Sequence, residues 1–262
     1  MLLTIDVGNT QIVLGMYTAD AGLETAEDGL AATWRVSTVS ERTEDELGIM
    51  IQGLLAGYGW SWNEAITGVA VSSGVPRVTT TIRRMVERYF DFEPIVLGPG
   101  VKTGLSILYD NPREVGADRI ANGVGAFDLF GGPSIVVDFG TGTTFDAISA
   151  AGEYMGGAIA PGVEVSMDAL SGRASALAAI ELVEPRSVIG KSTVESLQSG
   201  ALYGFAGQVD GIVERMVESM GQSTVLATGG LAGLIAPYTK SIEHVEPWLT
   251  LHGLRLIWQR NQ

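Results

Sequence analysis

Near its N-terminus the chain combines a carboxylate with a turn of glycine and small polar residues. The stretch "TIDVGNTQIVLG" places Asp6 after an apolar run and follows it with Gly8, Asn9 and Thr10. Such a turn lets backbone N–H groups approach phosphate oxygens, because glycine adds no side chain. A carboxylate beside it can hold a cation that offsets the charge of the phosphates. A single copy of this pattern is more often a plain hairpin turn than a phosphate-binding turn.

The same pattern returns in the second half of the chain. The stretch "SIVVDFGTGTTFDAIS" (134–149) again reads as an apolar run, an acid (Asp138), a glycine turn with Thr141, and a second apolar run. An internal repeat of this kind indicates two related domains. Further on, "VLATGGLAGLIAPY" reads as a strand, a glycine pair and a helix start, and Gly229 and Gly230 leave room for a flat ligand such as adenine. Phosphoryl transfer needs positioned phosphates and neutralised charge, which the two turns can supply.

A third candidate group is Asp118, which follows two small residues in "GADRIAN" at the predicted start of a helix. A carboxylate that accepts the proton of an attacking hydroxyl contributes about 10²–10⁴-fold to a rate. The alternative is that Asp118 only caps the helix. Arg119 beside it suits a planar carboxylate ligand, or else forms a structural ion pair. Asp146 is either a second acid of a metal site or an ordinary strand residue.

Composition argues against several classes of protein. The 262 residues include 16 basic and 30 acidic side chains, and the net charge of −14 argues against nucleic-acid binding. The absence of cysteine excludes thiolate metal sites, and no P-loop motif is present. No apolar run approaches the roughly 18 residues of a membrane span, and "MLLTID" does not resemble a secretory signal. We therefore expect a cytoplasmic protein that contacts no membrane. His244 and His252 are expected to be surface or packing residues.

Hydrophobic spacing predicts alternating strands and helices, which is typical of an α/β fold. An acidic stretch at 19–30 is expected to be an exposed turn, and Thr43 with Glu46, like Ser192 with Glu195, is expected to form a capping box at a helix start. Strands are expected at 2–6, 12–17, 34–37, within 66–76, at 94–97 and within 134–149, and helices from residue 44, over 78–89, around 120–127 and from residue 193.

The long helix that follows Ser192 carries glycine at four positions of one face: Gly200, Gly204, Gly207 and Gly211. A glycine in a helix interior costs about 1 kcal/mol relative to alanine, so the stripe needs a physical reason. We expect a second backbone to approach it closely. That backbone belongs either to another helix of the same chain or to a second subunit.

Together these motifs resemble one family. The stretches "DVGNT", "RTEDEL", "YDNPREVGADRIAN", "DFGTGTTFD", "GGAIAPGV" and "ATGGL" resemble the type III pantothenate kinases, within the superfamily of acetate and sugar kinases, heat-shock proteins and actin. The resemblance implies ATP-dependent phosphorylation of pantothenate to 4′-phosphopantothenate, the first step of coenzyme A synthesis. It implies an α/β fold of two ribonuclease-H-like (actin-like ATPase) domains, expected at 1–117 and 118–262, with a nucleotide cleft between them.

The resemblance also implies roles for single residues. Asp118 matches the catalytic base, and Asp138 matches the ligand of a monovalent cation, potassium or ammonium, that members need besides Mg²⁺. Members are homodimers, so a homodimer is expected here. The ATP contacts match Asp6, Val7, Gly8, Asn9, Thr10, Gln11, Ile12, Val13 and Thr141. The pantothenate contacts match Tyr109, Gly116, Ala117, Asp118, Arg119 and Thr193.

Two alternatives remain open at this point. One is an enzyme of the same superfamily with another substrate, such as a sugar or acetate kinase or an exopolyphosphatase; the segment from Tyr109 to Arg119 argues against it. The other is a regulator that binds nucleotide without turnover. Intact Asp6, Asp118 and Asp138 argue against the regulator, because a degenerate copy is expected to lose at least one of them.

Overall fold

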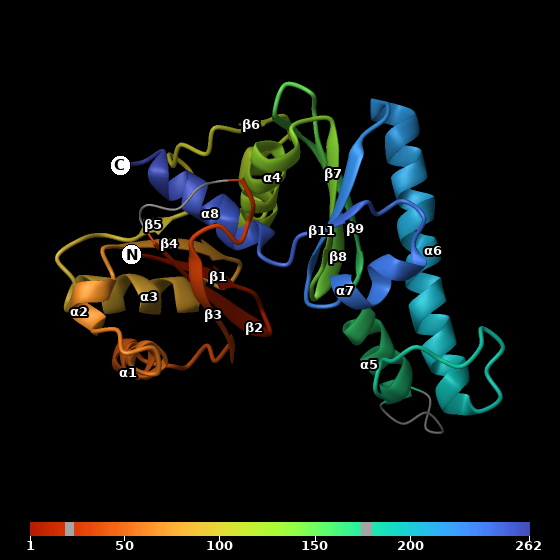
Figure 1. Cartoon of the computed structure of the whole chain (residues 1–262), viewed down its shortest axis with the longest axis horizontal. Coiled ribbons are helices and arrows are strands. Elements are labelled where there is room, and N and C mark those ends of the chain that lie inside the picture. The colour runs from red at the N-terminus through yellow and green to blue at the C-terminus, as the bar shows by residue number, and fades with distance from the viewer. Residues whose placement is uncertain (19–23, 174–179) are drawn as a thin grey trace. The chain divides into compact units, whose positions relative to one another are not determined.

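The computed structural model describes residues 1–18, 24–173 and 180–262, which form two compact units (Figure 1). Unit 1 comprises Met1–Leu129 and Trp248–Gln262, and unit 2 comprises Phe130–Pro247. Each unit has its own mixed β-sheet and its own cluster of buried apolar side chains.

The sheet of unit 1 has the strand order β3-β2-β1-β4-β5. Strand β1 pairs with β2 in antiparallel register and with β4 in parallel register, so it occupies the centre. Its apolar side chains Leu3 and Ile5 are at most 1% exposed and lie in the core. The strands are β1 (Leu2–Val7), β2 (Gln11–Tyr17), β3 (Leu30–Ser37), β4 (Gly68–Ser73) and β5 (Ile95–Val96).

The strands that belong to unit 2 repeat this order as β9-β8-β7-β10-β11. Strand β7 pairs antiparallel with β8 and parallel with β10, as β1 does with β2 and β4. The two units therefore share one strand order, as the sequence repeat predicts. The strands are β7 (Ser134–Phe139), β8 (Gly142–Ile148), β9 (Glu153–Pro161), β10 (Thr224–Gly229) and β11 (His244–Val245), and a two-residue strand β6 (Ser106–Ile107) precedes α4.

The helices of unit 1 pack on its sheet or on one another, and α1 shows why they form where they do. Thr43 Oγ1 accepts a hydrogen bond from Glu46 N–H (3.3 Å), and Glu46 Oε2 accepts one from Thr43 N–H (2.8 Å), which confirms the predicted capping box. The helices are α1 (Glu44–Ala56), α2 (Trp62–Ala65), α3 (Pro76–Tyr89), the 3₁₀ turn η1 (Pro112–Glu114), α4 (Ala117–Phe130) and α8 (Leu249–Gln259).

In unit 2 the long predicted helix is present, but its start differs from the prediction. Ser192 Oγ accepts a hydrogen bond from Glu195 N–H (3.2 Å). The Glu195 carboxylate instead accepts hydrogen bonds from Arg186 Nε (2.5 Å) and Lys191 N–H (2.9 Å), so only half of the expected capping box exists. The helices are α5 (Val163–Arg173), α6 (Thr193–Met220), α7 (Ala232–Ile235) and the 3₁₀ turn η2 (Ala236–Tyr238).

The compact units differ from the division at residues 117 and 118 that the sequence suggested. Helix α4 up to Leu129, and the whole of α8, belong to unit 1. Helix α8 contacts strands β1, β2 and β4, and α4 packs against α8. Contacts between residues distant in sequence decide which sheet a C-terminal segment covers, and a division at one chain position had placed residues 249–259 with the second half.

Candidate active site

The turn between β1 and β2 is held by a threonine that the sequence did not single out. Gly8 N–H donates to Gln11 O across the turn (3.0 Å). Thr38, just after β3, donates from its N–H to Thr10 O (2.9 Å) and from its hydroxyl to Gly8 O (2.7 Å). Two carbonyls of the turn are thus occupied by Thr38. Within the described residues Asn9 N–H has no hydrogen-bond partner, which leaves a donor for an anion.

Asp6 stands half-buried at the end of β1, in register with Ser72 of β4. The neighbouring Val7 and Ile12 are each 2% exposed and lie in the core, so only their backbones are available to a nucleotide. Gln11 is exposed and Val13 is half-buried. The stretch predicted to bind ATP is therefore a hairpin with Val7 and Ile12 in the core, and its turn with the adjoining Gln11 is the most exposed part.

The turn between β7 and β8 is one residue shorter than the turn between β1 and β2 and has a backbone support of its own. Gly140 N–H donates to Gly142 O (3.0 Å), and Gly162 N–H donates to Thr141 O (3.1 Å). A Cβ on Gly162 would lie 2.3 Å from Thr141 O and 2.5 Å from Gly140 O, so only glycine fits there. Gly162 precedes α5 and lies in the "GGAIAPGV" motif, to which the sequence assigned no role.

Asp138 lies half-buried at the end of β7, against Gly229 at the end of β10. A Cβ on Gly229 would lie 2.5 Å from Asp138 Oδ1 and 2.6 Å from Phe139 O, and Gly229 has a φ of 92°. A carboxylate oxygen and a carbonyl oxygen thus lie together beside Gly229. No cluster of three or more His, Cys, Asp or Glu side chains suited to a metal occurs in the described part of the chain. A cation at Asp138 would therefore need backbone oxygens as further ligands.

Asp118 lies in the first turn of α4 and is exposed. Gly116 O accepts the first helical hydrogen bond, from Ile120 N–H (3.1 Å). Asp118 Oδ1 accepts a hydrogen bond from Arg119 N–H (2.9 Å), which satisfies one of the helix's free N–H groups. Its Oδ2 accepts no hydrogen bond from any described residue. The carboxylate therefore stabilises the helix end with one oxygen and offers the other to a ligand.

The other residues matched to pantothenate contacts lie on separate elements. Tyr109 is half-buried between β6 and η1, whereas Arg119 is only 6% exposed. Thr193 is exposed at the first position of α6 in unit 2. Next to Tyr109, Asn111 Nδ2 donates to Glu114 Oε1 (2.7 Å), which closes the turn ahead of α4. This turn fixes the entry into the helix that carries Asp118.

Asp146 is fully buried on β8. Its Oδ1 accepts a hydrogen bond from the Tyr154 hydroxyl (2.7 Å), and its Oδ2 accepts one from the Thr144 hydroxyl (3.1 Å). Buried carboxylates need such partners. These contacts favour a structural role for Asp146 over the alternative of a second acid in a metal site.

The glycine stripe of α6 faces open space in unit 2. Apart from the adjoining backbone of α6 itself, no atom of the described residues lies within 4 Å of a Cβ placed on Gly200, Gly204 or Gly207. A close contact with another described helix of the same chain is therefore not present at these three positions.

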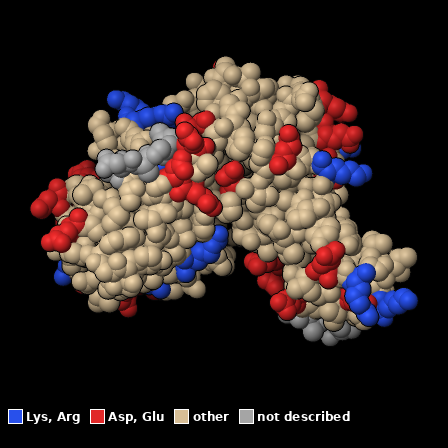
Figure 2. Space-filling model, viewed as in Figure 1, with Lys and Arg blue, Asp and Glu red and all other residues tan. Residues whose placement is uncertain are grey.

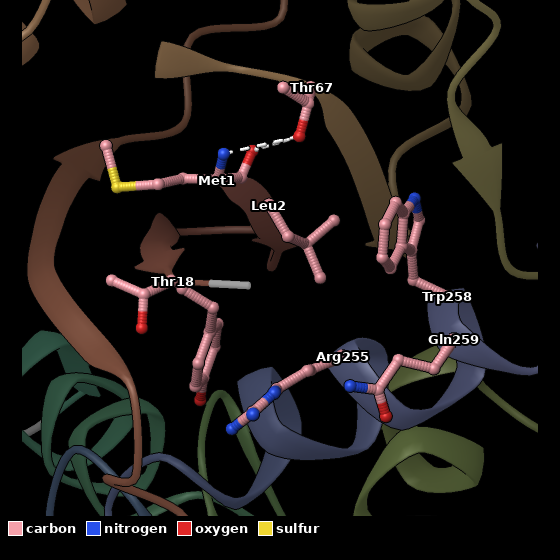
Figure 3. A pocket seen from close by; sticks show the side chains of 8 residues that line it. Met1, Leu2, Thr18, Thr67, Arg255, Trp258 and Gln259 are labelled. Atoms are coloured by element: carbon pink, nitrogen blue, oxygen red, sulfur yellow. Dashed lines mark hydrogen bonds between the residues drawn. The ribbon is translucent and has the colours of Figure 1, made fainter. Parts of the chain in front are cut away.

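Figure 2 shows acidic side chains spread over the face drawn, in keeping with the net charge of −14. A cavity of about 70 Å³ in unit 1 is lined by Met1, Leu2, Tyr17, Thr18, Thr67, Arg255, Trp258 and Gln259 (Figure 3), none of which is a predicted site residue. None of the helices in the part of the chain that the structure describes is long and apolar enough to cross a membrane.

Solved structures share this fold. A ROK family protein from Streptococcus pneumoniae TIGR4, solved in complex with sucrose, matches 99% of this chain and 98% of its own with a TM-score of 0.55 at 12% identity. The ethanolamine utilization protein EutJ from Carboxydothermus hydrogenoformans matches 97% of this chain and 89% of its own with a TM-score of 0.54 at 16% identity. At such identities the likeness concerns the fold alone, and it confirms the predicted α/β class with two sheets.

Sequence comparison is more specific. The family model described as type III pantothenate kinase matches residues 2–215. Relatives named type III pantothenate kinase occur in Streptomyces avermitilis, at 52% identity over 100% of this chain and 98% of the relative, and in Moorella thermoacetica, at 52% identity over 100% of both. The chain therefore belongs to the type III pantothenate kinase family.

Proposed function

We propose that this chain transfers the γ-phosphoryl group of ATP to a hydroxyl of pantothenate, the first step of coenzyme A synthesis. The observation that carries the proposal is the 52% identity, over the whole chain, to relatives named type III pantothenate kinase. In the reaction, the acceptor oxygen forms a bond to phosphorus, the bond from phosphorus to ADP breaks, and the hydroxyl proton must leave. The chain's residues have to position these groups and take up the proton.

Asp118 is proposed to be the base that accepts this proton, at Oδ2. The hydrogen bond from Arg119 N–H to Oδ1 orients the carboxylate, and the exposure of the side chain leaves Oδ2 accessible. General-base assistance of this kind is worth about 10²–10⁴-fold in rate. The proposed pantothenate contacts are Tyr109, Gly116, Ala117, Asp118, Arg119 and Thr193.

The two glycine turns are proposed to bind the phosphates of ATP, each through its backbone. In the first turn the proposal is supported by Thr38, which occupies the carbonyls of Gly8 and Thr10, and by the available N–H of Asn9. In the second turn it is supported by Gly162, which fixes the backbone at Thr141. The proposed ATP contacts are the stretch from Asp6 to Val13, with Val7 and Ile12 taking part through their backbones, and Thr141.

Two cations are proposed to offset the charge of the phosphates. Asp138 would hold a monovalent cation, potassium or ammonium, together with the carbonyl of Phe139, because such ions accept carbonyl oxygens as ligands. The two oxygens beside Gly229 are the donors that this role requires. Asp6 suits Mg²⁺ or its bound waters. The chain's net charge of −14 repels phosphate overall, so the bound cations would supply the local positive charge that the phosphates need.

A homodimer is proposed with α6 at its interface. The support is the open glycine stripe, where Gly200, Gly204 and Gly207 leave room for a second backbone. If Thr193 lies at the same interface, each pantothenate pocket is completed by the partner chain. Light scattering tests this: a dimer that Gly204→Leu converts to an inactive monomer supports it, and a fully active monomer refutes the shared pocket. The cytoplasmic location stays a prediction.

The decisive experiment measures ATP-dependent phosphorylation of pantothenate in potassium and in sodium buffer, with Asp118→Asn beside the unchanged protein. Three results together would support the proposal: turnover requires potassium, Asp118→Asn abolishes turnover, and this variant still binds ATP. They would support the pantothenate kinase activity, the monovalent-cation site and the role of Asp118 as the base. Turnover that Asp118→Asn leaves intact refutes the base alone. ATP binding without turnover in either buffer refutes the acceptor.

A further inference from the structure

Helices α4 and α8 of unit 1 cross with their backbones in contact. A Cβ on Gly253 would lie 1.9 Å from Ala121 O, and a Cβ on Gly125 would lie 2.9 Å from Leu249 O. Ala121 and Gly125 are one turn apart, as are Leu249 and Gly253, so matching rows of residues meet at the crossing. Because glycine stands on both helices there, backbone atoms fix their spacing.

Polar contacts flank this crossing and hold its register. The hydroxyl of Thr250 on α8 donates to Oδ1 of the buried Asn122 on α4 (2.7 Å). His252 Nε2, on a fully buried ring, lies 3.0 Å from Asp128 Oδ2. The Thr250–Asn122 and His252–Asp128 pairs contact α4 at different positions along its axis. Together they therefore oppose both sliding and rotation of one helix on the other.

Other residues of α8 pack on the sheet that carries the first glycine turn. Leu251 Cδ1 lies 2.7 Å from the Cβ position of Gly15 on β2, and Trp258 Nε1 lies 2.6 Å from that of Gly68 on β4. Figure 1 shows α8 running between α4 and these strands. The helix is therefore the spacer between the β1–β2 hairpin and the helix that carries Asp118.

We propose that α8 is a positioning element for Asp118, with Gly253 and Thr250 as its positioning residues; the inference rests on the proposed role of Asp118 as the base. Ala121, on which Gly253 packs, lies one helical turn after Asp118. A shift of α4 at this point moves the carboxylate relative to the β1–β2 turn, and a misplacement of about 1 Å can cost about 10²-fold in rate. Helix α8 lies outside residues 2–215, which the family model matches.

The test compares Gly253→Ala with Gly53→Ala in the full-length protein. A Cβ on Gly253 meets the Ala121 backbone, whereas a Cβ on Gly53, within α1 of the same unit, meets nothing within 4 Å. Gly253→Ala is expected to accelerate hydrogen exchange of the α4 amides. It is also expected to lower kcat at least ten-fold, where kcat is calculated per molecule able to bind ATP. Its ATP affinity should stay within two-fold of that of the wild-type protein. Gly53→Ala is expected to change none of these.

A second pair keeps the inference testable if Gly253→Ala does not fold. Thr250→Val removes the hydroxyl that donates a hydrogen bond to Asn122 Oδ1, and Thr250→Ser retains that hydroxyl. We expect Thr250→Val to lower kcat at least three-fold at unchanged ATP affinity and Thr250→Ser to restore it. Faster hydrogen exchange in α4 with an unchanged kcat per ATP-binding molecule would overturn the positioning role of α8, and the proposed role of Asp118 would remain. A fully active Asp118→Asn would overturn the base, and the inference with it, while the exchange data would still report on the crossing.

Discussion

The Asp138 carboxylate and Gly229 are in direct contact across two neighbouring strands of unit 2. Asp138 Oδ1 lies 2.5 Å from the position that a Cβ of residue 229 would take, and Phe139 O lies 2.6 Å from it. Gly229 also has a φ of 92°, which L side chains rarely adopt. The glycine is therefore required twice, once by its backbone conformation and once by the oxygens beside it.

We expect Gly229→Ala to weaken the proposed cation site. The left-handed backbone costs a non-glycine residue about 1–2 kcal/mol, and the new methyl group must displace the Asp138 carboxylate. The potassium concentration for half-maximal activity should rise at least ten-fold, as a potassium titration of turnover would show. Gly233→Ala nearby, where a Cβ meets nothing within 4 Å, is the control. An unchanged potassium dependence would contradict the assignment of Asp138.

Gly162→Ala is expected to impair ATP binding. Its Cβ would lie 2.3 Å from Thr141 O and 2.5 Å from Gly140 O, and these backbone atoms can yield only if the whole turn moves. The dissociation constant for ATP, measured by calorimetry, should increase at least ten-fold. Gly172→Ala, at an open position of α5, should leave it unchanged. Equal ATP affinity of both variants would show that the β7–β8 turn does not bind phosphate.

Gly116→Ala tests the orientation of Asp118. A Cβ there would lie 2.4 Å from Asp118 Oδ1, which is the end of a side chain and can rotate away. The protein should therefore fold normally while kcat decreases about ten-fold, less than the 10²–10⁴-fold loss expected for Asp118→Asn. Steady-state kinetics with both substrates, alongside a melting curve, would decide. A wild-type kcat in Gly116→Ala would refute a need for this carboxylate orientation.

The buried His252 makes stability depend on pH. Burial lowers its pKa, against the opposing effect of its hydrogen bond to Asp128. An unfolded histidine titrates near pH 6.5, so as pH falls below about 6.5 the unfolded chain binds a proton that the folded protein does not, and stability decreases. His252→Gln should remove this part of the loss. Urea unfolding at pH 7.5 and 5.5 would measure it, and equal losses in both proteins would exclude the effect.

Local signals predicted many of the helices and strands, but not β9, α5 or α8. Contacts between residues distant in sequence determine which residues support the site. The capping box of Thr43 and Glu46 and the two hairpins depend on residues close in sequence, so the sequence could predict them. Thr38 holds a turn about 30 positions earlier, and nothing in its local sequence marks it. Glu195 was misread as half of a capping box because Arg186 and Lys191 fold back onto it. Gly162 belongs to the "GGAIAPGV" motif, but its structural role depends on how the start of α5 packs against the β7–β8 turn.

The place of α8 has a consequence for the order in which the chain is made. Unit 1 begins with Met1 but is completed only by Trp248–Gln262. Synthesis runs from the N-terminus, at about 5–20 residues per second, so the face of the first sheet at Gly15 and Gly68 stays uncovered until unit 2 has left the ribosome. The half of the protein that is translated first is thus finished last. A stop codon before Trp248 would leave unit 2 whole and unit 1 without one of its packed layers.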